Sequence, residues 1–187
     1  MPEQLPSAAA REVFGEHFSA AEEYARFLET AGVERGLIGP REPARLWERH
    51  LINCAVVAEL IEPNAIVADI GSGAGLPGLV LAIVRPDLKM HLIEPMQRRI
   101  DFLNEAVETL GLVNVKSLRG RAEEFSGKVS ADVVVSRAVA PLSKLIPWCL
   151  PLLKQGGVML AMKGSSGEAE LDEASALLRK RRIASAR

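Results

Sequence analysis

A glycine-rich segment constrains the fold of this chain more than any other feature. It runs from Asp69 to Gly78, with the sequence Asp-Ile-Gly-Ser-Gly-Ala-Gly-Leu-Pro-Gly. The apolar run 65–68 before it suits a buried parallel strand, and glycines let a backbone turn sharply and approach a ligand without Cβ clashes. The apolar residues 79–84 after it predict a buried helix. A strand, a glycine turn and a helix in this order predict a crevice for a nucleotide-like ligand.

The spacing of the glycines fits two classes of cofactor. Gly73, Gly75 and Gly78 match the G-x-G-x-x-G pattern of dinucleotide-binding folds, which is weak on its own. Asp69 favours the methyl donor S-adenosylmethionine, because a pyrophosphate gains nothing from a carboxylate whereas a zwitterionic methionine can use one. Pro77 suits a first helical turn but offers no amide hydrogen to a phosphate. We therefore predict that S-adenosylmethionine contacts this turn, at Asp69, Ser72, Gly73 and Gly75.

Strand and helix patterns alternate along the rest of the chain. Further strands are predicted over 90–94, 115–118, 132–136 and 158–162, with helices over 96–110 and 142–153 between them. Such alternation implies a parallel sheet covered by helices on both faces. The predicted fold class is α/β, a Rossmann-like methyltransferase fold with a mainly parallel twisted sheet. Its ligands would lie beyond the carboxyl ends of the strands.

The segment before the glycine turn is predicted to be helical. Ser7 is expected to cap a first helix, and Ser19 with Glu22 forms a capping-box pattern for a second that ends at Gly32. A third helix is predicted over 43–61. Its apolar stripe consists of Trp47, Leu51, Cys54, Ala55 and Ala58.

Length and composition indicate one compact unit. With 187 residues, 48% apolar and 25% charged, the chain matches a soluble globular protein. We expect a helical extension over 1–62 packed on an S-adenosylmethionine-binding domain over 63–187. No segment is apolar for long enough to span a membrane, and the start does not resemble a signal peptide. Cys54 and Cys149 lack metal-ligand spacing, so we expect buried thiols, no metal site and a cytoplasmic location.

The distribution of charge permits an RNA-facing surface. The net charge of −1 argues against binding of nucleic acid by bulk charge alone. Residues 1–68 hold 6 basic against 11 acidic side chains, whereas residues 69–187 hold 17 against 13. The second segment is therefore basic by four, although such an excess usually only solvates a surface.

Side chains at the ends of the predicted strands complete a candidate site. Glu94 ends the second strand, where an acidic side chain can accept hydrogen bonds from an adenosine ribose; an ordinary surface carboxylate is the alternative. Ala122 and Glu123 follow the third strand and could border the adenine ring; an exposed helical Glu123 paired with a nearby arginine is the alternative. Arg137 follows the fourth strand, between the predicted donor and acceptor.

The segment at Arg137 also indicates the kind of acceptor. Enzymes that methylate exocyclic amines often place Asn or Asp, Pro-Pro and an aromatic residue here, and this chain has Ser136-Arg137-Ala138. An acceptor with its own lone pair, such as a ring nitrogen of guanine, needs no general base, so positioning can supply most of the catalysis. We predict that Arg137 is the catalytic residue. A structural ion pair with Asp69 or Glu94 is the alternative.

Several motifs together resemble the bacterial 16S ribosomal RNA guanine-N7 methyltransferase family, also called glucose-inhibited division protein B. The resemblance covers roughly residues 41–165. The motifs are the glycine turn, Ile83-Val84-Arg85-Pro86, Arg121-Ala122-Glu123-Glu124-Phe125, Ser136-Arg137-Ala138 and Met162-Lys163-Gly164, with Arg49-His50 ahead of the turn.

The resemblance implies methyl transfer to N7 of a guanine in 16S ribosomal RNA. It places cofactor contacts on Gly71, Leu76, Glu94, Ala122, Glu123 and Arg137, and it makes Arg49, His50 and Lys163 candidates for positioning the substrate. Packing is an equal alternative for His50. The implied partner is 16S ribosomal RNA or the small ribosomal subunit, with no membrane contact and a monomeric enzyme. The alternatives are a methyltransferase for a small molecule or protein, a nicotinamide-dependent oxidoreductase and a non-catalytic RNA-binding module.

The end of the chain departs from the usual methyltransferase pattern. Residues 168–182 are predicted to be helical, where methyltransferases of this fold add an antiparallel hairpin against the fifth strand. We therefore expect the hairpin to be missing, through truncation of the sequence, and the strand 158–162 to lie at an exposed edge.

Overall fold

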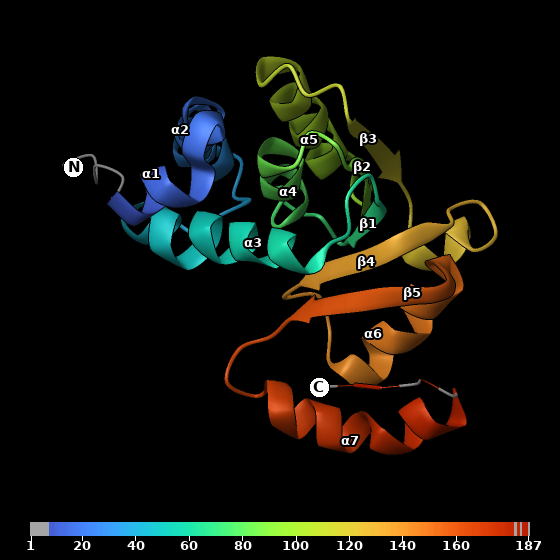
Figure 1. Ribbon diagram of the computed structural model, residues 1–187. Helices are drawn as coiled ribbons and strands as arrows, with labels where there is room; N and C mark the ends of the chain where they lie inside the picture. The colour runs from blue at the N-terminus through green and yellow to red at the C-terminus, as the bar shows by residue number, and fades with distance from the viewer. Residues whose placement is uncertain (1–7, 182, 184, 187) are drawn as a thin grey trace.

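Five parallel strands form a sheet with the order β3-β2-β1-β4-β5 (Figure 1). The computed structural model describes residues 8–181, 183, 185 and 186. The central strand, β1, pairs with β2 on one side and β4 on the other, and its Asp69 is in register with Leu92 of β2 and Val135 of β4. The bounds are β1 Ile66–Ile70, β2 Lys89–Glu94, β3 Val115–Arg119, β4 Ala131–Arg137 and β5 Leu153–Met162. The prediction of an α/β fold with a parallel sheet is confirmed.

Helices cover both faces of this sheet, and each face has its own apolar core. The first core joins the N-terminal helices, α4 (Gly78–Val84) and α5 (Gln97–Thr109) to one face. The second joins α6 (Leu142–Cys149), η7 (Leu150–Leu152) and α7 (Gly167–Lys180) to the other, as Figure 1 shows. No helix in the described part of the chain is long and apolar enough to cross a bilayer.

The N-terminal segment is helical, but the capping box predicted at Ser19 is wrong. The helices are α1 (Ala8–Phe14), η1 (Gly15–His17), α2 (Phe18–Phe27) and the π-helical η2 (Leu28–Gly32). Ser19 lies inside α2, and no side chain caps this helix, because the chain enters it directly from the turn η1. The predicted cap Ser7 lies outside the described residues.

The third predicted helix is confirmed as a helical segment with irregular winding. It consists of η3 (Pro43–Arg45), the π-helical η4 (Leu46–Ile52), α3 (Asn53–Ala55) and η5 (Val56–Leu60). All five residues of the predicted apolar stripe are buried. Trp47 packs against Phe18 with ring centroids 5.5 Å apart, which joins this segment to α2.

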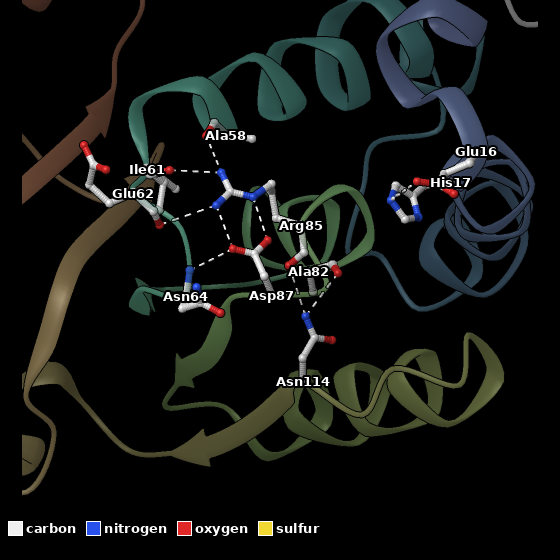
Figure 2. A network of polar contacts seen from close by, with 10 residues as sticks. All are labelled: Glu16, His17, Ala58, Ile61, Glu62, Asn64, Ala82, Arg85, Asp87 and Asn114. Carbon is white, nitrogen blue, oxygen red and sulfur yellow. Dashed lines mark hydrogen bonds and ion pairs between the residues drawn. The ribbon is translucent and has the colours of Figure 1, made fainter.

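A polar network ties the end of η5 to the turn between α4 and β2 (Figure 2). The Arg85 guanidinium donates to the carbonyl oxygens of Ala58 at 3.0 Å and Ile61 at 2.9 Å. It also binds the Asp87 carboxylate through Nε at 2.7 Å and NH2 at 2.8 Å. The Asp87 carboxylate in turn accepts from the backbone amide of Asn64 at 2.8 Å. Arg85 thereby adds a side-chain donor to carbonyls at the helix end, where the Ala58 carbonyl also accepts from the Ile61 amide at 3.2 Å.

Strand β5 lies at the edge of the sheet, as predicted. It pairs with β4, and Val158 is 48% exposed. In the described part of the chain no antiparallel strand joins the sheet. After β5 the chain forms α7, which packs against α6 instead of extending the sheet.

Candidate functional site

The glycine turn leaves β1 at the centre of the sheet and is held against β2. The Gly71 amide donates to the Ile93 carbonyl at 2.9 Å. Gly71 has φ +70°, and a Cβ there would lie 2.7 Å from Val139 Cγ2, so a side chain is excluded on both grounds. The turn therefore exposes bare backbone beside the end of β4, which is how a glycine turn approaches a ligand.

Asp69 is fully buried beneath this turn. Its Oδ2 accepts from the Gly78 amide at 3.1 Å, and its carbonyl accepts from Ser72 Oγ at 3.0 Å. Its Oδ1 has no hydrogen-bond partner among the described residues. Burial raises the pKa of this carboxyl to about 7, since its charged form is desolvated. Asp69 and Ser72 thus brace the turn internally, and their contact with a cofactor stays a prediction.

A tyrosine from the N-terminal helices braces the same turn. Tyr24 of α2 is fully buried and donates its hydroxyl to the Ala74 carbonyl at 2.7 Å. A Cβ on Gly75 would approach this hydroxyl to 2.9 Å. Tyr24 was not predicted from the sequence, because a contact across fifty residues leaves no local pattern.

Glu94 lies against the turn, as its spacing predicted. Its carboxylate accepts from the Gly73 amide at 3.1 Å and from the Met96 amide at 3.0 Å, and Arg99 lies 3.4 Å away. Glu94 is 1% exposed, so the alternative of an ordinary surface carboxylate is wrong. Ala122 is buried at the start of η6 (Ala122–Phe125), and Glu123 next to it is exposed.

Arg137 ends β4 and reaches across to the segment 46–55. Its guanidinium donates to Cys54 Sγ at 3.2 Å, to the Arg49 carbonyl at 3.4 Å and to His50 Nδ1. Burial raises the pKa of the Cys54 thiol to about 11, so Arg137 faces a neutral thiol. The predicted structural alternative, an ion pair with Asp69 or Glu94, is wrong, because these partners hold Arg137 elsewhere.

A cavity of about 790 Å³ opens beside Arg137, at the carboxyl ends of β4 and β5. Lys163 Nζ donates to the Ala140 carbonyl at 2.6 Å and lies 2.7 Å from the Glu170 carboxylate. The cavity is lined by Arg49, Asn53, Arg137, Ala138, Val139, Ala140, Pro141, Met162, Lys163, Gly164 and Glu170. Two of the predicted positioning residues, Arg49 and Lys163, therefore share one cavity with Arg137.

His50 lies behind this cavity and does not line it. Only 9% of the residue is exposed, and its ring is hydrogen-bonded on both sides, by Glu42 and by Arg137. The packing alternative therefore describes its surroundings. Glu42 was not predicted from the sequence, because it lies in a loop eight residues before His50 and belongs to no motif.

The residues around the turn fit S-adenosylmethionine. The glycines form a cradle that a side chain would fill, and the Glu94 carboxylate beside Gly73 suits ribose hydroxyls. Two buried atoms at the ends of β1 and β4, Asp69 Oδ1 and Ser136 Oγ, have no partner in the described part of the chain. Such orphaned polar atoms are uncommon away from functional sites.

Comparison with protein families gives one match over most of the chain. Residues 17–186 match the GidB family, described as rRNA small subunit methyltransferase G. A ribosomal RNA small subunit methyltransferase G of Thermobifida fusca (strain YX) is 64% identical over 170 residues, covering 91% of this chain and 72% of that protein. The match is wider than the span 41–165 on which the resemblance rested.

Solved structures of low sequence identity share this fold. A putative caffeoyl-CoA O-methyltransferase from Staphylococcus aureus superimposes with a TM-score of 0.60 at 16% identity, covering 94% of this chain and 91% of that one. TYW2 of M. jannaschii, in complex with AdoMet, has a TM-score of 0.50 at 21% identity and covers 58% and 50%. At this identity both show the fold alone.

Proposed function

The chain belongs to the rRNA small subunit methyltransferase G family, and from this premise we propose that it transfers a methyl group from S-adenosylmethionine to N7 of a guanine in 16S ribosomal RNA. The observation that carries the proposal is the position of Arg137, which lines a cationic cavity next to the glycine turn. Family membership also removes the nicotinamide-dependent oxidoreductase from the alternatives.

The glycine turn and Glu94 hold the donor in this proposal. Glu94 accepts from the Gly73 amide, so the carboxylate that would bind the ribose also fixes the turn. Gly71 and Leu76 belong to the same turn, and Ala122 and Glu123 follow β3, where they would border the adenine. Bound S-adenosylmethionine supplies an electrophilic methyl group on a sulfonium.

The cavity orients the acceptor base. N7 of guanine carries a free lone pair, so no proton has to be removed and orientation supplies most of the rate. Arg137 donates three hydrogen bonds to the protein, and a guanidinium has five N–H groups, which leaves donors for the O6 or phosphate oxygens of RNA. Arg49 and Lys163 line the same cavity as further candidates for phosphate contact, although the Glu170 carboxylate beside Lys163 offsets part of the positive charge.

The proposal extends to a monomer that acts in the cytoplasm on the ribosomal RNA of the small subunit. Sedimentation of the free protein tests the monomer.

Transfer of labelled methyl groups to small ribosomal subunits that lack the modification tests the function. We expect label on a guanine, and mapping of the modified nucleotide should place the methyl group on N7. For Arg137→Ala we expect the rate of methyl transfer to fall by at least about 100-fold, as for removal of one positioned donor. The matched control is Arg26→Ala on α2, which lies away from the cavity and leaves activity unchanged. Label on metabolites or proteins with none on RNA would decide for the small-molecule or protein methyltransferase.

A further inference from the structure

Three side chains from separate parts of the chain form a row that ends in the cavity. Glu42 Oε2 lies 2.5 Å from His50 Nε2, and His50 Nδ1 is hydrogen-bonded to the Arg137 guanidinium. Glu42 precedes η3, His50 lies on η4, and Arg137 ends β4. Glu42 does not line the cavity itself and reaches it through its neighbours.

The chemistry of the row fixes the protonation of His50. A guanidinium can only donate, so His50 Nδ1 must be the acceptor and carries no proton. The ring hydrogen is then on Nε2 and is donated to the Glu42 carboxylate. Only the neutral ring with this tautomer satisfies both neighbours, because a protonated ring would point N–H at N–H.

The charges around His50 agree with a neutral ring. Burial lowers the pKa of His50, and the positive charges of Arg137 and Arg49 lower it further, whereas the Glu42 carboxylate raises it. Arg49 lies 3.7 Å from Glu42 Oε1 and so shares the same carboxylate. The hydrogen bond to His50 lowers the pKa of Glu42, which therefore stays ionised at neutral pH.

We propose that Glu42 is a positioning residue for Arg137, acting through neutral His50, and that protonation of His50 releases the guanidinium from its place in the cavity. This rests on the proposed function for the role of Arg137 toward RNA. Glu42 orients the ring, the ring holds the guanidinium, and the guanidinium meets the acceptor. Methyl transfer is then switched off in acid by a group that does not touch the substrate.

Variants of Glu42 and His50 test the proposal through the pH profile of methyl transfer. Glu42→Ala removes the acceptor for Nε2, and we expect kcat at pH 7.5 to fall about tenfold with the donor Kd unchanged. Glu42→Gln keeps an acceptor and restores most of kcat. It also removes the charge that raises the pKa of His50, so the acid limb, meaning the loss of activity on the acid side of the pH profile, moves to lower pH. His50→Asn offers Arg137 an acceptor that does not titrate, and the acid limb disappears.

Glu48→Ala is the matched control, since Glu48 is an exposed carboxylate on the same helical segment. It leaves both kcat and the acid limb unchanged. Equal kcat for Glu42→Ala and Glu48→Ala, or an acid limb that persists in His50→Asn, would overturn the proposal. Thermal unfolding of each variant shows whether a loss of activity follows from loss of fold.

Nitrogen NMR of the free protein separates this proposal from the proposed function. The chain has three histidines, and His50→Asn assigns the ring signals of His50. We expect the tautomer with the proton on Nε2, and a pKa below 6.5 that falls further in Glu42→Gln. A ring protonated on Nδ1 would refute the row even if the enzyme is active. The expected ring in a protein that leaves ribosomal RNA unmodified would refute only the proposed function.

Discussion

Asp69 shows at the scale of one residue how a glycine turn can keep a carboxylate away from water. The carboxyl accepts from the Gly78 amide, and a Cβ on Gly78 would approach Asp69 Oδ2 to 2.6 Å and Leu92 Cδ2 to 2.3 Å. No larger residue fits at Gly78, so the helix start packs closely against the Oδ2 side of the carboxylate. The raised pKa of Asp69 is the electrostatic consequence of this packing.

Replacing Asp69 with Asn should make stability less dependent on pH. The folded pKa of Asp69 is raised to about 7, above its unfolded value, so the folded state binds more protons between about pH 4 and 7 and loses stability as pH rises. Asp69→Asn keeps an acceptor for the Gly78 amide and removes the charge. We expect the free energy of unfolding of Asp69→Asn to rise by about 1 to 3 kcal/mol relative to that of the native chain between pH 5 and pH 8, measured by urea unfolding.

The difference between the two proteins at each pH is the quantity to compare. His50 acts in the opposite sense, because its lowered folded pKa costs stability as pH falls below its unfolded value near 6.5, but it contributes equally to both proteins. An unfolding free-energy difference that is the same at pH 5 and pH 8 would contradict a buried carboxylate that titrates near neutrality.

The candidate site was predictable where its residues are local in sequence. Glu94 follows from a strand end and a fixed spacing from the glycines, and the structure places it 3.1 Å from Gly73. Tyr24 and Glu42 were missed, because each acts through one hydrogen bond to a partner that only the folded chain brings near. Arg137 was placed at its strand end correctly, but its partner His50 lies 87 residues away.

At the scale of elements, the strands were predictable because buried parallel strands are continuous apolar runs. Their observed bounds differ from the prediction mostly by one residue. The start of β5 differs by five, because Leu153 pairs with Ala131 ahead of a register shift and residues 154–157 do not continue the apolar run. The capping box at Ser19 failed because α2 continues directly from the turn η1, and the first amide of α2, that of Phe18, already donates to the Gly15 carbonyl. The apolar pattern thus predicted the buried faces of the elements more reliably than the polar side chains predicted where the helices begin.

Arg85 connects two elements, and its replacement should loosen their junction. Arg85→Lys keeps the charge but cannot donate to Asp87 from two nitrogens while also reaching the carbonyls of Ala58 and Ile61. We expect a loss of about 1.5 to 3 kcal/mol in the free energy of unfolding, as for partly buried hydrogen bonds to a charged group. Urea unfolding measures it, with the exposed Arg41→Lys as a control that changes stability little. Equal stability of the two variants would show that the network contributes nothing.

At the scale of the molecule, the contacts of the helical extension 1–62 join it to the domain 63–187. Tyr24 donates to the glycine turn, Arg85 binds the end of η5, and Arg137 binds the segment 46–55. The first apolar core contains side chains from both sides of residue 62. Each contact crosses the boundary at a different element, so the extension completes the domain and is not an appendage.

Such a junction predicts that the extension and the domain unfold in one cooperative transition. The two tryptophans allow a direct test, since Trp47 packs in the extension and Trp148 lies on α6 in the second core. Trp148→Phe leaves Trp47 as the reporter, and Trp47→Phe leaves Trp148. For each variant, the urea midpoint from tryptophan fluorescence should coincide with that from far-ultraviolet circular dichroism, as two-state unfolding requires. Fluorescence of Trp47 that changes at a clearly lower urea concentration than the dichroism of the same variant would mean that the extension unfolds alone, and the boundary at residue 62 would then separate two independent units.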